Sequence, residues 1–312
     1  MKNVVVIGGG TGLSVMLRGL KQIDNIKLSA IVTVADDGGS TGRIRKQFHI
    51  PAMGDIRNVM CAMAPEETIF TSLMNYRFDS DESELGGHNL GNLILTALTQ
   101  TTGSFMEAIH TFSKFLNVRG DIIPSSLDVI TLYAMMEDGT IVRGESNIPQ
   151  FNNRIMKVFY QEKVEPTRET LKAIHEADVI VYGIGSLYTS IMPNVIVDGV
   201  VEQLRLNKAK KIYFCNAMTQ PGETDDFTLE DHVRAIQEHS FMEAVDVVIT
   251  HNNIASEEVL KKYKAMGSIP VRVAEEEHSY QIIKRDVLNF DDEYIRHDSN
   301  KIRDCLAEFI NS

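Results

Sequence analysis

The sequence predicts a Rossmann-like three-layer α/β/α fold, with a mostly parallel sheet between two helical layers and a small antiparallel hairpin addition over about 127–162. Short β-branched runs alternate with amphipathic helical patterns along most of the 312 residues, which is typical of a parallel sheet covered on both faces. Two of these runs end directly in glycine-rich loops, which is how such folds build phosphate sites. We expect one α/β domain over 1–312, a length that can bury a sizeable core.

The strands are predicted at short apolar runs. These runs are 4–7, 28–34, 179–182, 212–214, 245–249 and 271–273. One stretch breaks the alternation with helices, because 129–135 and 140–143 flank the pair Asp138-Gly139. Such a pair between two apolar runs is a strong short-range signal for a β-hairpin, and we therefore expect a small antiparallel addition there.

The helices are predicted from apolar spacing and from capping residues. A helix directly after the first glycine-rich loop follows from the spacing i, i+3, i+4 and i+7 of Leu13, Met16, Leu17 and Leu20. Further apolar stripes run over 90–98 and, at the end of the sequence, over 302–310. Thr228 and Ser256 precede acidic first turns, which predicts that they are helix N-caps.

The first glycine-rich loop has four glycines in the five residues 8–12. It is not a dinucleotide fingerprint, because Leu13 stands where Gly-x-Gly-x-x-Gly needs its third glycine, and no Gly-Lys-Ser/Thr of a Walker loop follows. Glycines let backbone N–H groups approach an anion at a helix start. We therefore expect a phosphate site formed by Gly9, Gly10, Thr11 and Gly12. The alternative is a tight strand-to-helix turn without a ligand.

The second glycine-rich loop begins with two acids, Asp36 and Asp37. Adjacent residues of an extended chain point to opposite faces, so we expect one of the two to face the ligand. That acid either binds a divalent ion such as Mg²⁺, which prefers hard oxygen ligands, or accepts a hydrogen bond from a ribose hydroxyl. A turn-capping Asp is the alternative without a ligand. The loop also brings the candidate binding residues Gly39, Ser40 and Arg43.

Two further clusters carry candidate catalytic side chains. Asp55 is a candidate metal ligand or general base, and it is also a natural N-cap for the helix that follows. Arg57, beside Asn58, is a candidate phosphate clamp through its planar guanidinium group. His88 and Asn92 lie four residues apart at a predicted helix start and share one face. His88 is a candidate proton donor, with a hydrogen-bonded helix entry as the alternative.

Small polar residues also follow later predicted strands. Gly185, Ser186 and Ser190 offer N–H groups and hydroxyls for a second phosphate. Asn216 opens the polar segment 216–224. Because ligands of open α/β sheets bind beyond the carboxyl ends of the strands, we expect these loops to meet at one ligand crevice.

Composition argues against several classes of partner. The net charge of −12 at pH 7 disfavours nucleic acid or an anionic membrane surface as a general partner. We expect no membrane span, since no run approaches ~20 consecutive apolar residues, and no secretory signal opens the sequence. Cys61, Cys215 and Cys305 are far apart, which fits a reduced, cytoplasmic protein without disulfides.

Taken together, the loops resemble those of the YvcK family of bacterial gluconeogenesis factors. The resemblance rests on the ordered segments 8–14, 35–40, 54–58, 87–92, 185–191 and 216–224. It implies a cytoplasmic protein needed for normal cell shape and for growth on gluconeogenic carbon sources, with a protein partner in cell-envelope regulation. It also implies binding of UDP-activated sugars such as UDP-N-acetylglucosamine, without an established reaction.

The resemblance also implies site residues. Tyr263 would stack on a uracil base, and Arg296 would reach a diphosphate. The nucleotide site then comprises Gly9, Gly10, Thr11, Gly12, Asp36, Gly39, Ser40, Arg43, Arg57, Asn58, Asn92, Gly185, Ser186, Leu187, Ser190, Asn216, Tyr263 and Arg296. The wider superfamily includes CofD, the magnesium-dependent 2-phospho-L-lactate transferase, whose paired acids resemble Asp36 and Asp37. This implies a metal site at Asp36, Asp37 and Asp55.

Three functions stay open, and we favour the first. A regulatory protein binds a nucleotide sugar, signals through a partner and leaves the ligand intact. A magnesium-dependent transferase of the 2-phospho-L-lactate type uses a nucleotide-diphosphate donor, with the metal and Arg57 neutralising charge on the leaving phosphate. A nicotinamide oxidoreductase is disfavoured by Leu13, although we expect NAD to occupy the crevice as a surrogate because it shares phosphate and ribose groups with a nucleotide sugar. The sheet and hairpin also leave surfaces suited to a homo-oligomer.

Overall fold

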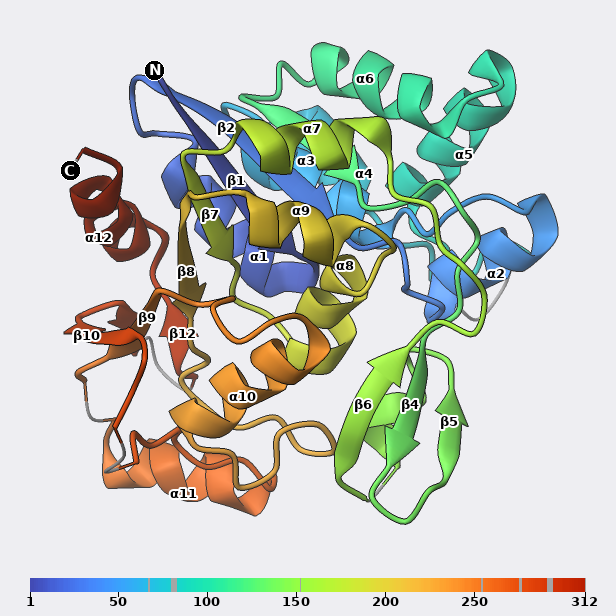
Figure 1. Ribbon diagram of the computed structural model, residues 1–312. Helices are drawn as coiled ribbons and strands as arrows, with labels where there is room; N and C mark the ends of the chain where they lie inside the picture. The colour runs from blue at the N-terminus through green and yellow to red at the C-terminus, as the bar shows by residue number, and fades with distance from the viewer. Residues whose placement is uncertain are drawn as a thin grey trace.

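The central sheet confirms the predicted parallel architecture. The structure is a computed structural model that describes residues 1–66, 68–79, 83–151, 153–253, 255–274, 277–290 and 294–311. Within these residues the main sheet has seven parallel strands in the order β10-β9-β8-β7-β1-β2-β3 (Figure 1). The strands are β1 (Lys2–Gly8), β2 (Ile26–Val32), β3 (Asp121–Pro124), β7 (Val179–Tyr182), β8 (Lys210–Phe214), β9 (Val247–His251) and β10 (Gln281–Arg285).

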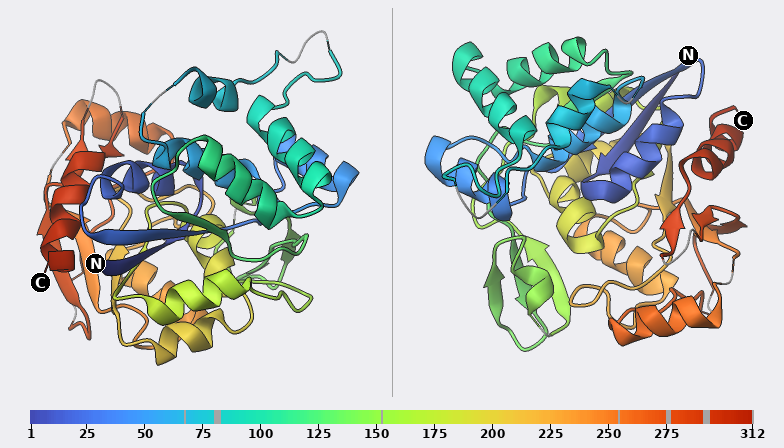
Figure 2. Two further views of the ribbon diagram at one scale, coloured as in Figure 1. Left: turned by 90° about the horizontal axis from the view of Figure 1, so that it is seen from above. Right: turned by 180° about the vertical axis from the view of Figure 1, so that it is seen from behind.

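Helices cover both faces of this sheet, which completes the three layers. They are α1 (Gly10–Leu20), α2 (Gly39–Phe48), α3 (Gly54–Met63), α4 (Ile69–Asn75), α5 (Leu90–Thr102), α6 (Phe105–Phe115), α7 (Arg168–Glu176), α8 (Met192–Val195), α9 (Val200–Leu206), α10 (Leu229–His239), α11 (Glu257–Ala265) and α12 (Ser299–Asn311), with short helical turns η1 (Ile148–Gln150) and η2 (Leu187–Ile191). In Figure 1 α7, α9 and α10 lie in front of the sheet, and the view from behind in Figure 2 shows α1, α3 and α12 on the other face.

The side on which successive strands are added to the sheet changes at β1. This change fixes where a ligand can bind. Val4 of β1 is in register with Leu28 of β2 on one side and with Val179 of β7 on the other. The chain runs outward from β1 to β2 and β3, and then returns to β7 and runs outward the other way. Such a switch point leaves a crevice beyond the carboxyl ends of the two strands. The loops after β1 and β7 are the two that border it.

Burial of β1 and α1 explains why their sequences are so apolar. Val4 to Ile7 of β1 are all no more than 1% exposed, as a strand covered on both faces requires. The predicted stripe of α1 is fully buried, as the apolar spacing indicated. In α12 the side chains of Ile302, Leu306 and Ile310 are buried against α1, which confirms the terminal helix.

The predicted hairpin is confirmed and gains a third strand. An antiparallel sheet has the order β5-β4-β6, with β4 (Tyr133–Met136), β5 (Ile141–Arg143) and β6 (Ile155–Phe159), and we call it the appended sheet (lower right in Figure 1). Gly139 has φ +83 in the connecting turn, a conformation that favours glycine. The backbone N–H of Val158 donates to His239 Nε2 at 3.0 Å, which ties β6 to α10.

One predicted strand is not formed, and two strands of the main sheet were not predicted. The run 271–273 is not a strand, because its backbone bonds to the loop after β8, with Val271 N donating to Ala217 O at 3.0 Å. The sheet edge is instead β10, whose polar sequence gave no strand signal. β3 is short and was also not predicted. A further antiparallel pair consists of β11 (Leu288–Asn289) and β12 (Arg296–His297).

The capping predictions for α10 and α11 are confirmed. Thr228 forms a capping box with Asp231, and the hydroxyl of Ser256 accepts from Val259 N. Asp55 is not an N-cap, since Met53 occupies that position and Asp55 lies in the first turn of α3. In the described part of the chain, no helix has the length and apolar character that crossing a bilayer would require.

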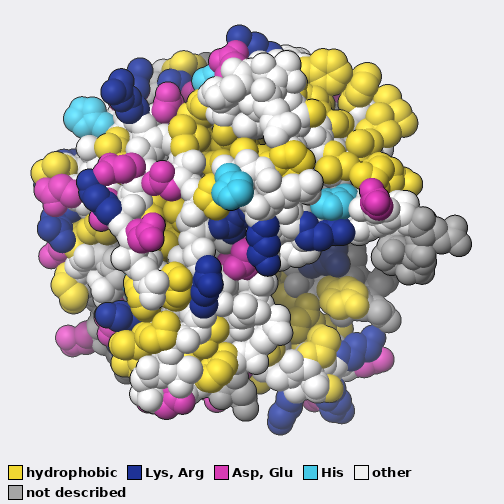
Figure 3. Space-filling view, turned by 90° about the vertical axis from the view of Figure 1, so that its right-hand side faces the viewer, with side chains coloured by type: hydrophobic (Ala, Val, Ile, Leu, Met, Phe, Trp, Pro, Cys, Tyr) yellow, Lys and Arg dark blue, Asp and Glu magenta, His cyan; other side chains and the backbone are white. Residues whose placement is uncertain are grey.

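Exposed hydrophobic side chains gather on one side of the molecule. Ile69, Phe70 and Leu73 of α4 and Phe115 at the end of α6 are all at least 40% exposed. The rings of Phe70 and Phe115 meet edge to face with centroids 5.0 Å apart. Figure 3 shows hydrophobic side chains concentrated at the upper right of this side. We call these four residues the α4–α6 patch.

Candidate functional site

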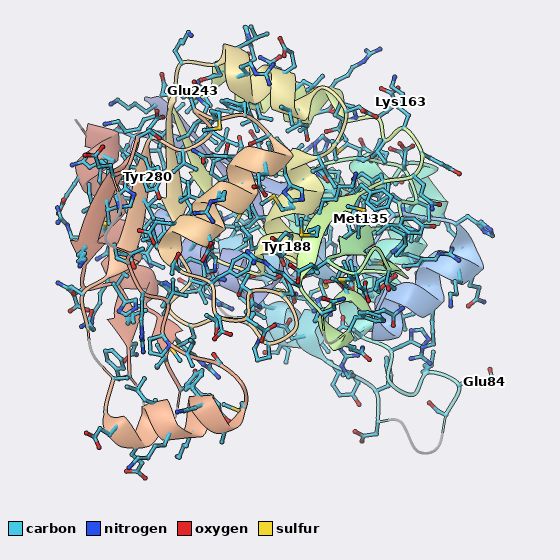
Figure 4. All side chains as sticks on the ribbon, turned by 60° about the horizontal axis from the view of Figure 1, so that its bottom comes forward. Glu84, Met135, Lys163, Tyr188, Glu243 and Tyr280 are labelled. Atoms are coloured by element: carbon cyan, nitrogen blue, oxygen red, sulfur yellow. The ribbon has the colours of Figure 1, made fainter. Side chains whose placement is uncertain are left out.

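A cleft of about 490 Å³ opens at the carboxyl ends of β1, β7 and β8, where the switch point predicts a ligand. Its lining includes nine of the residues expected to bind nucleotide, which are Gly9, Gly10, Thr11, Gly12, Gly185, Ser186, Ser190, Asn216 and Tyr263. In Figure 4, which turns this end forward, Tyr188 of η2 lies near the centre, between Met135 of the appended sheet and Tyr280.

A larger hollow of about 580 Å³ lies at the other end of the strands. It is bordered by Asn3 and Lys27 near the starts of β1 and β2, and by α6 and α7. None of the glycine-rich loops reaches it. The cleft at the carboxyl ends is therefore the candidate site, although it is the smaller of the two.

The first glycine-rich loop needs its glycines for close approach and for backbone conformation. Gly10 has φ +67, and a Cβ atom on Gly9 would come within 2.5 Å of Asp55 Oδ2. A Cβ atom on Gly12 would come within 2.4 Å of the carbonyl oxygen of Ile184. Within this fully described segment, α1 starts at Gly10 without a side-chain cap. Gly10, Thr11 and Gly12 of this first turn line the cleft, and the N–H groups of a helix start suit an anion.

Asp55 lies directly against this loop. The backbone N–H of Gly10 and the side chain of Asn58 hydrogen-bond to its carboxylate. Burial, followed by the nearby charge of Asp36, raises the pKa of Asp55 to about 6, and the opposing effects of Gly10, Arg57 and Asn58 are smaller. A carboxyl group with such a pKa can exchange protons near neutral pH, as a general base requires.

Asp36 and Asp37 point in different directions, as adjacent residues were expected to. Asp36 Oδ1 accepts from Gly38 N at 2.9 Å, and Asp36 Oδ2 would lie 2.8 Å from a Cβ atom on Gly54. Asp37 Oδ1 instead accepts from Ser146 N at 3.0 Å, which fastens the appended sheet to the β2 loop. Asp36 therefore lies near Asp55, and neither of these two lines the cleft, whereas Asp37 has a structural partner.

The predicted residues of α2, α3 and α5 form a hydrogen-bonded group beside the cleft. Ser40 Oγ lies 3.1 Å from His88 Nδ1 and 3.4 Å from Asn92 Nδ2. Arg57 donates to Asn92 Oδ1 at 3.4 Å and to Asn58. Gly39 begins α2 in this group. These residues do not line the cleft, so their contact with a ligand stays a prediction.

His88 and Arg43 lie at the outer end of this group. Arg43 Nη2 donates to the carbonyl oxygen of Gly86 at 2.8 Å. Burial lowers the pKa of His88, and the charge of Arg43 lowers it further. The ring of His88 contacts the hydroxyl of Ser40 through Nδ1. Its proposed role as proton donor stays a prediction.

The loop after β7, with Gly185 and Ser186, already holds an anion of the protein. Glu223 accepts hydrogen bonds from the hydroxyl of Ser186 and, at 3.1 Å, from the hydroxyl of Thr189. The backbone N–H groups of Tyr188 and Thr189 also donate to it. The carboxylate thus occupies the start of η2, where a second phosphate was expected. Burial raises the pKa of Glu223, while these donors lower it.

Glu145 enters the cleft from the appended sheet and was not predicted. It lines the cleft together with Pro149. Burial raises the pKa of Glu145 to about 8, and Asp36, Asp55, Asp37 and Glu223 raise it further through like charge. In the sequence Glu145 is a single acid in a polar turn, which ordinarily indicates a solvated loop. Only the three-dimensional fold places it among other acids.

The two C-terminal residues implied by the resemblance differ in their placement. Tyr263 lines the cleft, with its hydroxyl held between Ile295 N at 2.9 Å and Ile295 O at 3.3 Å. Arg296 does not line the cleft and places its guanidinium group 5.4 Å from the ring centroid of Tyr294. Its neighbour His297 does line the cleft, and burial lowers the pKa of His297 to about 4.

Two other predictions need qualification. The side chain of Leu187 is fully buried in the core, so only its backbone can contact a ligand. Across the described residues, no three His, Cys, Asp or Glu side chains form a group that could hold a metal ion by themselves. Magnesium at Asp36 and Asp55 would need oxygen atoms from the ligand as further partners.

Comparisons with known families, sequences and structures all match this chain over nearly its whole length. The family described as 2-phospho-L-lactate transferase CofD matches residues 4–288. The gluconeogenesis factor of Halalkalibacterium halodurans is 46% identical over 98% of this chain and 96% of its own length, and that of Bacillus subtilis is 43% identical over 98% of each. A crystal structure of a UPF0052 family member from Bacillus halodurans has a TM-score of 0.93 at 46% identity, and the match covers 98% of this chain and 99% of that one.

Proposed function

Because this chain belongs to the CofD-like family and, within it, to the YvcK family of gluconeogenesis factors, we propose that it is a nucleotide-sugar-binding regulatory protein. It acts in the cytoplasm under gluconeogenic conditions and in cell morphogenesis, through a protein partner in cell-envelope regulation. The observation that carries the proposal is the glycine-rich start of α1 at the cleft, where Gly9 offers no side-chain cap and Gly10 has φ +67.

The lining of the cleft supports a ligand that has both phosphate and hydroxyl groups. The N–H groups at the start of α1 suit the negative charge of a diphosphate. Glu145 and Glu223 instead offer oxygen acceptors, which suit the hydroxyl donors of a sugar. A nucleotide sugar of the UDP-N-acetylglucosamine type has both kinds of group, with NAD as a surrogate that shares phosphates and ribose.

Calorimetric titration of nucleotide-free protein with UDP-N-acetylglucosamine, with and without Mg²⁺, tests this proposal. We expect binding that does not need the metal, a ligand that is chemically intact after hours of incubation, and displacement of NAD by the sugar nucleotide. Failure of every nucleotide to bind would contradict the proposal. A strain that lacks the protein should regain growth on gluconeogenic carbon and normal shape when the wild-type chain is supplied.

A magnesium-dependent transferase is the second candidate, and the position of Asp55 favours it. Asp55 lies against Gly9 and Gly10 of the first glycine-rich loop with Asp36 nearby, and the pKa of Asp55 is about 6. Bound Mg²⁺ would neutralise charge on a leaving phosphate. Asp55 would hold the metal with Asp36 or take a proton from the acceptor. Metal-dependent consumption of a nucleotide-diphosphate donor, abolished in Asp55→Asn, would establish this function in place of the first.

A further inference from the structure

The two faces of the appended sheet, at the lower right of Figure 1, differ in burial. Its inner face is covered, since Ala134, Met136 and Val142 are no more than 8% exposed. An antiparallel sheet with one covered face ordinarily carries polar side chains on its other face. The outer face here departs from that rule. By the alternation of β4, β5 and β6, the outer face consists of Tyr133, Met135, Ile141, Arg143, Lys157 and Phe159.

Strand register places these six side chains in two rows across the sheet. Read from β5 through β4 to β6, the rows are Arg143-Tyr133-Phe159 and Ile141-Met135-Lys157. The rings of Tyr133 and Phe159 stack with their centroids 5.8 Å apart, and Ile141 is 48% exposed. The centre of the outer face is therefore apolar, with one cation on each of the two flanking strands. Apolar patches of this kind on a protein surface mark interaction sites.

The two cations of the outer face are available to a partner. Arg143 and Lys157 are exposed, and neither forms an ion pair within the part of the chain that the structure describes. Lys157 Nζ lies 5.6 Å from the centroid of the Phe159 ring, which holds its charge beside the apolar centre. The acids Glu137 and Asp138 lie beyond the second row, in the turn between β4 and β5. In a protein with a net charge of −12, the outer face is a local basic surface.

We propose that the outer face docks an acidic segment of a protein partner that also carries apolar side chains. This inference rests on the proposed function, because it supplies the surface for the partner through which the regulatory protein acts. Aromatic residues, Met and Arg are the side chains enriched at protein interfaces. The partner's carboxylates pair with Arg143 and Lys157, and its apolar side chains pack on Tyr133 and Phe159.

Two other occupants fit the outer face less well. A second copy related by a two-fold axis would bring the same face against itself. Arg143 and Lys157 would then meet further cations and no acid of the face, which disfavours that contact. Single-stranded nucleic acid stacks its bases on aromatic rings between cations, but the net charge of −12 repels a polyanion. A short acidic segment makes both kinds of contact with far fewer charges.

The first test finds the preferred chemistry without a known partner. A phage library of short random peptides is selected on the wild-type protein and depleted on the double variant Arg143→Glu, Lys157→Glu. We expect the enriched peptides to combine Asp or Glu with aromatic or aliphatic residues, because the depletion removes peptides that bind elsewhere. No enrichment, or enriched peptides without acids, would overturn the inference.

The second test measures the affinity of the most enriched peptide by fluorescence anisotropy. The double variant should bind it ~10-fold or more weakly, because attraction at two cations becomes repulsion. Ile141→Ser should also weaken binding, through lost apolar contact. Lys210→Glu at the exposed start of β8 and Leu206→Ser on α9, where Leu206 is 62% exposed, are the matched controls. Unchanged affinity in the folded double variant, or equal losses in the controls, would overturn the inference.

A third measurement needs no substitution and decides the matter if a variant fails to fold. The selected peptide, bound to the wild-type protein, should slow hydrogen exchange in β4 to β6 and leave β10 unchanged. Protection confined to other elements would place the peptide elsewhere and overturn the inference.

Titration with UDP-N-acetylglucosamine separates this inference from the function on which it rests. The variants should bind the sugar nucleotide as the wild type does, since Ile141, Arg143 and Lys157 do not line the cleft. If the nucleotide binds and no acidic peptide is enriched, the docking surface fails alone. If peptide binds the outer face and no nucleotide binds, the proposed function fails alone. Short oligothymidylate bound by the wild type and lost in the double variant, or a dimer that Ile141→Ser dissociates, would assign another occupant and overturn the inference.

Discussion

Glu223 is the residue on which the loop after β7, with Ser186 and Thr189, depends. Its carboxylate satisfies the hydroxyls of Ser186 and Thr189 and the N–H groups at the start of η2. In the sequence these donors look available for phosphate, because nothing local shows that an acid 37 residues further on reaches Ser186. The loop is thus shaped by an anion of the protein, and at the start of α1 the Gly10 N–H likewise donates to the Asp55 carboxylate.

Removing the carboxylate of Glu223 should destabilise the loop after β7. In Glu223→Ala we expect the free energy of unfolding to fall by about 1–3 kcal/mol, because several buried donors lose their acceptor. Glu223→Gln should cost less, since its amide oxygen still accepts. Added formate should restore part of the stability and the nucleotide affinity of Glu223→Ala but not of wild type. Denaturant unfolding and calorimetry measure both, and no effect of formate would argue against the anion role.

Gly10 allows a direct test of the first glycine-rich loop. Gly10 has φ +67 and lines the cleft, whereas Gly103 has φ +71 at the end of α5, where an added Cβ atom would have open space within 4 Å. Replacing either glycine by alanine should destabilise the protein by about 1–2 kcal/mol through the left-handed backbone. Only Gly10→Ala should also weaken nucleotide binding, as measured by calorimetry. Equal affinities in the two variants would show that the loop is only a turn.

Among the elements, the appended sheet makes the contribution to the site that was least expected from the sequence. Its segment from Gly144 to Pro149 is held at both ends, by Asp37 on the β2 loop and by close packing of Pro149 on Gly222 of the β8 loop. Between these attachments it carries Glu145 into the cleft. The hairpin that breaks the α/β alternation therefore closes one side of the site.

Releasing one attachment should loosen the appended sheet alone. In Asp37→Ala the N–H of Ser146 loses its acceptor, and we expect faster hydrogen exchange at Ser146 and in β4 to β6, with β1 and β7 unchanged. Asp121→Ala is the matched control, because Asp121 is exposed at the start of β3 and pairs with Lys27 there. Unchanged exchange at Ser146 would contradict the attachment.

The sequence predicts elements well where periodicity is strong and poorly where tertiary contacts decide. β1 and α1 were identified from continuous apolar runs and helical spacing, both of which report burial directly. The run 271–273 has the composition of a strand, yet its backbone bonds to the loop after β8. In the site, the glycines were visible because their conformation is local. The surroundings of Glu145 depend on distant segments and left no signal.

For the whole molecule, the main feature is the convergence of acids from separate elements near one cleft, which Glu145 and Glu223 line and where Asp36 and Asp55 lie close enough to raise the pKa of Glu145. Asp36, Asp55, Glu145 and Glu223 come from the β2 loop, α3, the appended sheet and the β8 loop, and each of the last three has a raised pKa. Burying these carboxyl groups close together lowers the free energy of unfolding at neutral pH.

The expected homo-oligomer stays a prediction. The α4–α6 patch is the surface at which a substitution such as Phe70→Glu would test it, with the oligomeric state measured by sedimentation.

The pH dependence of stability should reveal this cluster. The pKa of Glu145 is raised from 4.5 to about 8 on folding, so the folded state binds the extra proton. Its contribution to the free energy of unfolding is complete below pH about 4.5 and is lost as pH rises to about 8. Glu145→Gln keeps a neutral group and should unfold at higher urea than wild type at pH 8, by roughly 1–2 kcal/mol. The two proteins should converge near pH 4.5. Glu162→Gln, at an exposed position of the same region, should follow wild type throughout, and a parallel shift of both variants at every pH would contradict the assignment.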